Sequence, residues 1–248
     1  MQITARRRFK EHTPAGAPHI LRAGSGPATE ARTRYPAKVV DPARADRVLK
    51  DGVNNRKIGS HVVKGRWRGL PVFTLTLEER KTCWSGCRHW LSCYGNKMHF
   101  SPRHAHGPAL VAAVERDLDG LLARHPAGIV VRLHVLGDFY SVGYVRAWAG
   151  WLRRLPTLRV YGYIGWPPSS DIGRAVHEMV EEFGWGRCAV RFSNHGTPTR
   201  GAASVADPGL RGRIPEGIVC PVQSGDAECC GSCTLCWATE ENIAFIDH

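Results

Sequence analysis

Three cysteines lie within eleven residues near the first third of the chain, in KTCWSGCRHWLSCYGNKMHF, which starts at Lys81. Cys83, Cys87 and Cys93 follow a Cys-x3-Cys-x5-Cys pattern, so three thiols of one loop can converge on one centre. A structural zinc site takes four protein ligands and usually Cys-x2-Cys pairs. The spacing therefore favours a four-iron, four-sulfur cluster (4Fe-4S) with one iron left open to a small molecule.

Two alternatives stay open for this loop. The cysteines could be packing residues, or they could bind zinc with a nearby imidazole as the fourth ligand. The candidate imidazoles are those of His89, His99, His104 and His106.

A second group of cysteines lies near the end of the chain, in CPVQSGDAECCGSCTLCW. Cys230, Cys233 and Cys236 have the tight Cys-x2-Cys-x2-Cys spacing of ferredoxin-type cluster loops. Cys220 is the natural remote fourth ligand, and Cys229 is its competitor. This segment predicts a second 4Fe-4S cluster held entirely by protein thiolates, with structural zinc as the alternative. Cys188 lies within an apolar strand pattern and is expected in the core.

Composition and termini bound the class of protein. The 248 residues are 43% hydrophobic and 23% charged, which is enough apolar material for a packed core. No apolar run of membrane-spanning length occurs, and the basic N-terminus lacks the apolar stretch of a secretory signal. We therefore expect a cytoplasmic protein without membrane contact, in which clustered cysteines indicate metal rather than disulfides.

The net charge of +12 indicates a polyanionic partner, most simply nucleic acid. Residues 1–47 hold ten Lys or Arg against four Asp or Glu and lack apolar periodicity, so they are expected to form a flexible basic arm. The stretch NNRKIGSHVVKGRWRG interleaves basic residues with a tryptophan, which suits single-stranded or flipped nucleic acid as well as a solvated basic hairpin. The candidate nucleic-acid-binding residues are Arg56, Lys57, Lys64, Arg66, Trp67 and Arg68.

Strand and helix patterns alternate from Leu70 to Ser193. Strands are expected near 60–64, 70–77, 128–136, 158–166, 187–194 and 217–223, and helices over 107–126, 141–156 and 171–184. The unit length suits parallel βα units, so the predicted fold class is α/β, a partial (β/α) barrel with parallel strands, or else an open parallel sheet. The expected division is a basic arm (1–47), the partial barrel (48–216) and a C-terminal cysteine-rich, metal-binding extension (217–248).

The first cysteine loop, following a strand and leading into βα units, resembles the radical S-adenosylmethionine superfamily. CWSGCRHWLSCYGN, VVRLHVLGDFYS and the final CPVQ, CCGSCTLCW and NIAFIDH resemble more closely the phage-associated gene product 88 family. The last gap of the loop has five residues where the superfamily usually has two, and Tyr94 follows the third cysteine. The resemblance implies S-adenosylmethionine as a cofactor, with Gly137, Asp138 and Tyr94 beside it. Asp138 or Ser141 could instead cap the following helix.

These patterns lead to two hypotheses. The first is an iron–sulfur enzyme of the radical S-adenosylmethionine type that modifies a nucleic acid or nucleotide, with an electron donor such as a flavodoxin or ferredoxin. The second is a nucleic-acid-binding protein without turnover, in which clusters or zinc only stabilise the fold.

Overall fold

An open five-stranded sheet forms the centre of the molecule in the computed structural model, which describes residues 19–193, 201–207 and 209–246. The strand order is β2-β3-β5-β6-β7, with β3, β5, β6 and β7 parallel and β2 antiparallel at one edge. The strands are β2 (Lys50–Asp51), β3 (Val72–Thr74), β5 (Ile129–Leu133), β6 (Leu158–Ile164) and β7 (Cys188–Phe192). The predicted α/β class with parallel strands is confirmed, and the sheet is open and not a closed barrel. The next strand in the described chain, β8, belongs to a different sheet, so the five strands do not close on themselves.

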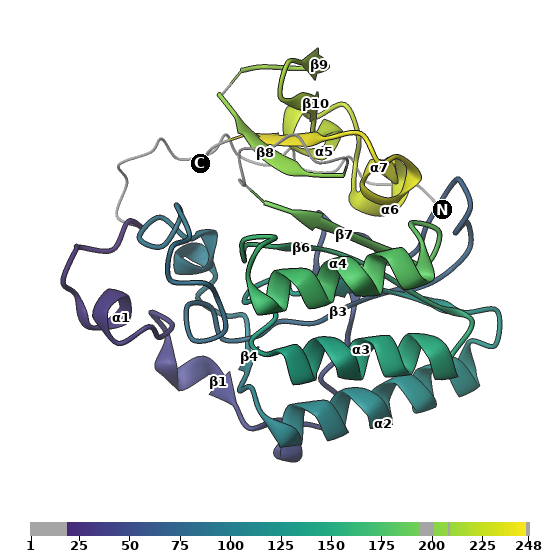
Figure 1. Cartoon of the computed structure of the whole chain (residues 1–248), viewed down its shortest axis with the longest axis horizontal. Helices are drawn as coiled ribbons and strands as arrows, with labels where there is room; N and C mark the ends of the chain where they lie inside the picture. The colour runs from purple at the N-terminus through teal and green to yellow at the C-terminus, as the bar shows by residue number, and fades with distance from the viewer. Residues whose placement is uncertain (1–18, 194–200, 208, 247–248) are drawn as a thin grey trace, which may run out of the picture.

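Three amphipathic helices cover one face of the sheet: α2 (Pro108–Arg124), α3 (Val142–Arg154) and α4 (Asp171–Phe183) (Figure 1). They lie where the spacing of apolar residues predicts them. Ser141 caps α3 by accepting from the Tyr144 amide at 3.1 Å, so the cap is Ser141 and not Asp138. Ser170, one residue before Asp171, caps α4 in the same way. The apolar sides of the helices and the inward residues of the strands form the larger core.

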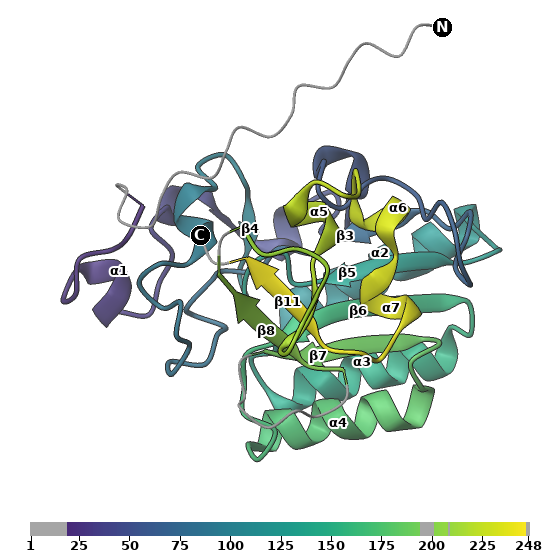
Figure 2. The ribbon, with the colours of Figure 1, turned by 90° about the horizontal axis from the view of Figure 1, so that it is seen from above.

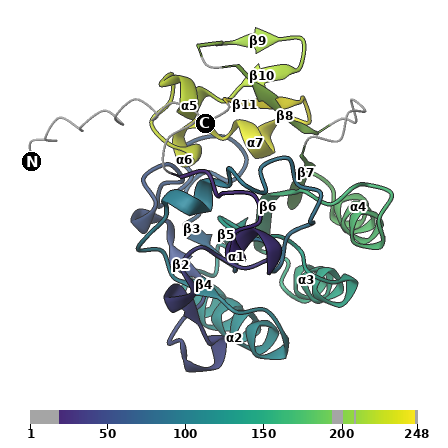
Figure 3. The ribbon, with the colours of Figure 1, turned by 90° about the vertical axis from the view of Figure 1, so that its left-hand side faces the viewer.

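The opposite face of the sheet is covered by the C-terminal segment (Figures 1 and 3). This segment forms its own four-stranded sheet in the order β8-β11-β10-β9. Its elements are β8 (Ala203–Ala206), β9 (Arg213–Ile214), β10 (Gly217–Val219), α5 (Pro221–Ser224), α6 (Cys230–Cys233), α7 (Leu235–Ala238) and β11 (Ile243–Ile246). The expected last strand is β10, but β11 follows it and pairs parallel with both β8 and β10. The C-terminal unit therefore includes residues from Ala203 and not only those from 217 onward.

Arg191 fastens this segment to the sheet. Its side chain is fully buried and donates to the carbonyls of Cys236 (3.2 Å), Thr239 (2.5 Å) and Glu241 (2.6 Å). Trp67 and Trp237 stack in the same apolar layer, with ring centroids 5.1 Å apart. The C-terminal segment is thus packed into the core and is not a separate tail.

The described part of the expected flexible arm, residues 19–47, also packs on the domain. Leu21 and Thr33 are buried, and the Tyr35 hydroxyl donates to the Asn96 carbonyl at 2.6 Å. Short elements order this stretch and the loops beside it. They are α1 (Gly26–Thr29), β1 (Val39–Val40), which pairs with β4 (Arg103–His104), and the 3-10 turns Pro36–Lys38, Pro42–Arg44, Gly52–Asn54 and Tyr94–Lys97. Residues 1–18 lie outside the described residues. The strand expected near 60–64 is reduced to a bridge between His61 and Pro71.

Candidate metal centre

The first cysteine loop follows β3 and lies at the carboxyl end of the parallel strands, where open α/β sheets place their ligands. Ionisation of Cys93 or Cys87 would raise the pKa of Cys83, so the charges of the three thiols act on one another. Burial raises the pKa of Cys83 well above its usual range and that of Cys93 to about 11. Thiolates at these positions therefore need a positive partner, and a bound metal supplies one.

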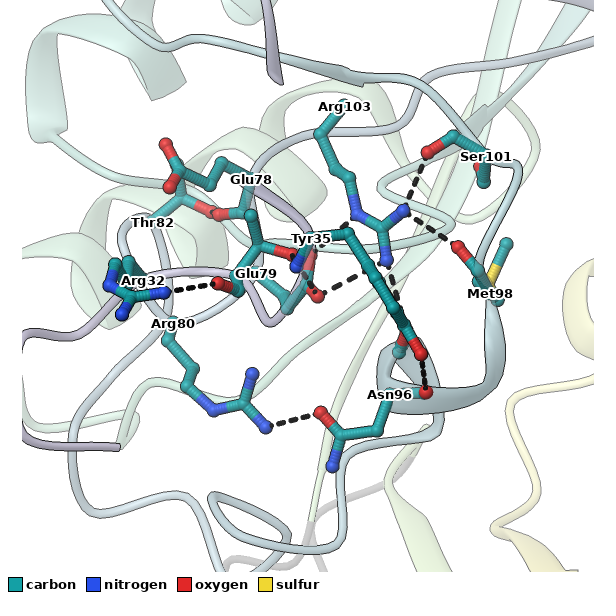
Figure 4. Close-up of polar contacts among 12 residues, drawn as sticks. Arg32, Tyr35, Glu78, Glu79, Arg80, Thr82, Asn96, Met98, Ser101 and Arg103 are labelled. Atoms are coloured by element: carbon teal, nitrogen blue, oxygen red, sulfur yellow. Dashed lines mark hydrogen bonds and ion pairs between the residues drawn. The ribbon is translucent and has the colours of Figure 1, made fainter. Parts of the chain in front are cut away.

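A buried ion pair holds the base of this loop (Figure 4). Arg103 and Glu79 are joined at 3.0 Å, with the two side chains 0% and 1% exposed. Glu79 also accepts from the Thr33 hydroxyl at 2.7 Å. Arg103 donates further to the carbonyls of Gly95 (2.9 Å), Met98 (2.7 Å) and Ser101 (2.6 Å). The pair thus fixes the segment that follows Cys93 against the segment that precedes Cys83.

Arg80 brings a positive charge to the thiols. Its Nε donates to the Trp90 carbonyl at 2.8 Å. One terminal nitrogen donates to the Asn96 side chain, also at 2.8 Å (Figure 4). The other terminal nitrogen, Nη1, is buried and has no hydrogen-bond partner among the described residues. The guanidinium lowers the pKa of Cys87 and Cys93, against the larger effect of burial. A buried donor without an acceptor beside three thiols fits a site that takes an anionic group.

The four candidate histidines have the following surroundings. His104 is buried, and burial lowers its pKa to about 4. His99 packs against Tyr35, His106 packs against Tyr140, and His89 lies 3.4 Å from the Ser92 hydroxyl. Within the described ranges, no three His, Cys, Asp or Glu side chains are grouped so that they could hold a metal ion. Zinc would draw its thiolates to about 3.8 Å from one another in a tetrahedral site with Zn–S bonds of about 2.3 Å. A four-iron cluster binds each thiolate on a different iron and spaces them more widely.

Gly137 and Asp138 lie at the carboxyl end of β5, next to the first cysteine loop. Gly137 has φ +79, and a Cβ there would lie 2.6 Å from the Leu77 Cβ, so the position requires glycine. The Asp138 carboxylate is buried and accepts from the amides of Phe139 (2.7 Å) and Gly165 (2.6 Å). Burial raises the pKa of Asp138 to about 7, and its charge in turn raises the pKa of Cys83.

Tyr94 follows Cys93 and is 40% exposed. Burial of its hydroxyl raises the pKa of Tyr94, while the charge of Arg132 on β5 acts in the opposite direction. The structure therefore brings the expected cofactor residues to the same edge of the sheet as the three thiols.

The second group of cysteines surrounds one small cavity. Cys220, Cys230, Cys233 and Cys236 all line it, together with Pro221, Val222, Thr234, Leu235 and Ile243. Cys229 does not line the cavity; it is the N-cap residue of α6, and its sulfur lies 3.6 Å from the Ser232 hydroxyl. The four thiols that share the cavity are those expected from spacing, and Cys229, the alternative fourth ligand, is not among the lining residues. Cys188 is buried in β7, and burial raises its pKa to about 12.

Loop 57–63 closes over this second site. The Cys230 amide donates to the Lys57 carbonyl at 2.7 Å, and the Gly231 amide donates to the Ile58 carbonyl at 3.0 Å. The sheet contributes Arg132, Tyr161 and Tyr163 from below, and sequence reasoning missed all three. The signal was a single arginine in VVRL and two tyrosines spaced two residues apart in VYGYI, which share the face turned away from the helices.

The expected nucleic-acid-binding residues fall into two groups. Arg56, Lys64, Arg66 and Arg68 are exposed, and Lys57 is half-buried. Trp67 is only 2% exposed, stacks on Trp237 and donates from its indole to the Gly186 carbonyl at 2.8 Å. Its expected contact with a base is corrected to a core role, because neither ring face is accessible in this structure.

Residues 47–163 match the family model described as gene product 88. The match includes the first cysteine loop, the Gly137–Asp138 turn and the strands β2 to β6, and it ends before the second group of cysteines. No curated protein and no solved structure matches the chain. The comparisons lend no support to the resemblance to the radical S-adenosylmethionine superfamily. No helix among the described residues combines the length and the apolar character that crossing a bilayer requires.

Proposed function

We propose that the chain is an iron–sulfur enzyme with two 4Fe-4S clusters, of the radical S-adenosylmethionine type, acting on a nucleic acid or nucleotide. Cys83, Cys87 and Cys93 would hold the first cluster, and the four cavity-lining cysteines would hold the second. The single observation that carries the proposal is the first loop. Its three thiols follow β3 at the carboxyl end of the sheet, the charges of Cys87 and Cys93 act on Cys83, and the buried Arg80 Nη1 has no hydrogen-bond partner among the described residues.

The first cluster, when bound, would leave one iron open to S-adenosylmethionine and supply the electron that cleaves it. The residues of the chain do the positioning. The Glu79–Arg103 pair fixes both ends of the loop, and Arg80 offsets the charge of the thiolates. Asp138 presents a buried carboxyl group suited to a cationic amine, and Gly137 lets the backbone approach closely. The exposed arginines beside the second site offer contacts to phosphate.

Anaerobic reconstitution with iron and sulfide tests the proposal. We expect about eight irons and eight sulfides per chain, and about four of each in a variant that lacks Cys233 and Cys236. S-adenosylmethionine should change the spectrum of that variant and should leave unchanged a Cys87→Ala variant, which keeps only the second cluster. Zinc in place of iron, or no response to S-adenosylmethionine in either variant, would contradict the proposal.

The second candidate function is a nucleic-acid-binding protein without turnover, in which the clusters only stabilise the fold. The observation in its favour is the docking of the second cysteine group onto the sheet, since a metal there would stabilise the fold directly. Clusters that assemble, no response to S-adenosylmethionine, and salt-dependent binding to single-stranded nucleic acid would support this candidate over the enzyme.

A further inference from the structure

Tyr163 makes a direct contact with one of the cavity-lining cysteines. Its hydroxyl lies 2.8 Å from the Cys236 sulfur, and Cys236 is only 8% exposed. Tyr163 belongs to β6 of the central sheet, and Cys236 belongs to α7 of the C-terminal segment, 73 residues later in the chain. Figure 2 shows α6, α7 and β11 lying over the strands of the sheet. The hydroxyl therefore reaches across the boundary between the two parts of the molecule.

Arg132 supports this contact from the neighbouring strand. Its guanidinium lies 4.6 Å from the Tyr163 ring centroid and 5.6 Å from the Tyr161 ring centroid. No carboxylate among the described residues forms an ion pair with Arg132, and its side chain donates to the Leu133 carbonyl. The guanidinium of Arg132 thus lies against both phenol rings on the sheet face that carries the C-terminal segment.

The phenol of Tyr163 carries its proton at neutral pH, because the ordinary pKa of a tyrosine is about 10. A protonated phenol beside a metal-bound thiolate acts only as the donor, so the O–H points at the sulfur. The positive charge of Arg132 over the ring strengthens that donor.

We propose that Tyr163, polarised by Arg132, is a positioning residue that raises the reduction potential of the cluster held by Cys220, Cys230, Cys233 and Cys236. This inference rests on the proposed function. Reduction adds one electron, taken from an external low-potential donor, and makes the cluster more negative. A hydrogen bond to a ligating sulfur and a nearby fixed cation stabilise the more negative state. The proton stays on Tyr163 throughout, so no proton transfer accompanies the step.

The test is a redox titration of the reconstituted full-length protein, with dithionite as reductant and electron paramagnetic resonance as the readout. The signal that disappears in Cys233→Ala with Cys236→Ala belongs to the C-terminal cluster. We expect Tyr163→Phe to move the midpoint of that signal to a more negative potential and to leave the other signal in place. Arg132→Met should move the same midpoint in the same direction.

Tyr140→Phe is the matched control, because it also removes one phenol oxygen and Tyr140 instead contacts Gly107. It should change neither midpoint. Unchanged midpoints in Tyr163→Phe with full iron content, or equal shifts of both signals, would overturn the inference and leave the proposed function standing. A wild-type protein that assembles no redox-active cluster would overturn both.

Discussion

Replacing Glu79 by Gln removes one charge of the buried pair and keeps the shape of the side chain. Arg103 is then left fully buried without its counter-charge, since both side chains are shielded from water in the native fold. Breaking a buried pair from one side costs about 3–5 kcal/mol. A hydrogen bond from Thr33 can still reach the amide oxygen of the new side chain, so the charge is the main loss. We therefore expect Glu79→Gln to lower the free energy of unfolding by about 3–5 kcal/mol.

Urea unfolding of the metal-free protein, followed by circular dichroism, measures this loss. With a slope of about 2–3 kcal/mol per molar urea, the midpoint should fall by about 1–2.5 M. The matched control is Glu182→Gln, which removes the charge from the exposed Arg153–Glu182 pair, where the two side chains are 59% and 38% exposed. Water and salt screen that pair, so its midpoint should hardly move.

Equal midpoints for the two variants would refute the reasoning, because burial would then make no difference to the pair. Replacing both buried partners, with Glu79→Gln and Arg103→Met, should not restore stability. The carbonyls of Gly95, Met98 and Ser101 would lose their donor, and buried carbonyls without donors are costly.

Other measurements test single features of the fold. Burial lowers the pKa of His134 to about 3. The free energy of unfolding therefore falls as the pH drops below 6.5, because the unfolded chain takes up a proton that the folded chain does not. Between pH 6.5 and 4.5 this loss amounts to roughly 2–3 kcal/mol. His134→Asn should reduce the fall in urea midpoint over that range, and an unchanged fall would contradict the assignment. Ser141→Ala should cost about 1 kcal/mol of unfolding free energy by removing the cap of α3, and Gly137→Ala should cost about 1–3 kcal/mol in backbone strain alone. Substituting Arg66 and Arg68 together by Ala should flatten the dependence of log affinity for single-stranded DNA on log salt by about 0.7 for each phosphate that the variant no longer neutralises; an unchanged slope would place the phosphate-binding surface elsewhere.

The parts of the fold that the sequence predicts well are those with a local signal. The helices α2, α3 and α4 have continuous apolar stripes, and each is found within a few residues of its expected bounds. The caps were harder to place, because Ser170 and Asp171 are both good capping residues and only the backbone geometry separates them. Barrel or open sheet could not be decided from βα units, since closure depends on strands beyond the last unit.

The C-terminal sheet could not be predicted from local pattern. β8 and β11 are four residues each and pair across almost forty residues of chain, so neither carries a clear alternating signal of its own. The same limit applies to the cysteines. Spacing alone puts Cys220 and Cys229 on nearly equal terms, and only the fold shows that Cys229 faces Ser232 and Gly59 while Cys220 lines the shared cavity. The predicted contact of Trp67 with a base was wrong because the basic neighbours of Trp67 are exposed while its own ring is buried.

Arg132 on β5 is the residue whose charge acts on both cysteine-bearing segments. It lowers the pKa of Tyr94 in the first loop and of Cys230 in the second group, in each case against the larger effect of burial. The segment that matches the gene product 88 model ends at residue 163 and so includes Arg132, Tyr161 and Tyr163, the side chains on which the second group rests. The matched segment thus contains the polar side chains of the sheet, and the second group of cysteines, which packs on them, lies outside the match. Arg132 lies 4.6 Å from the Tyr163 ring centroid, and the Tyr163 hydroxyl contacts the Cys236 sulfur at 2.8 Å, so polar groups of the sheet reach the cavity that the four thiols line.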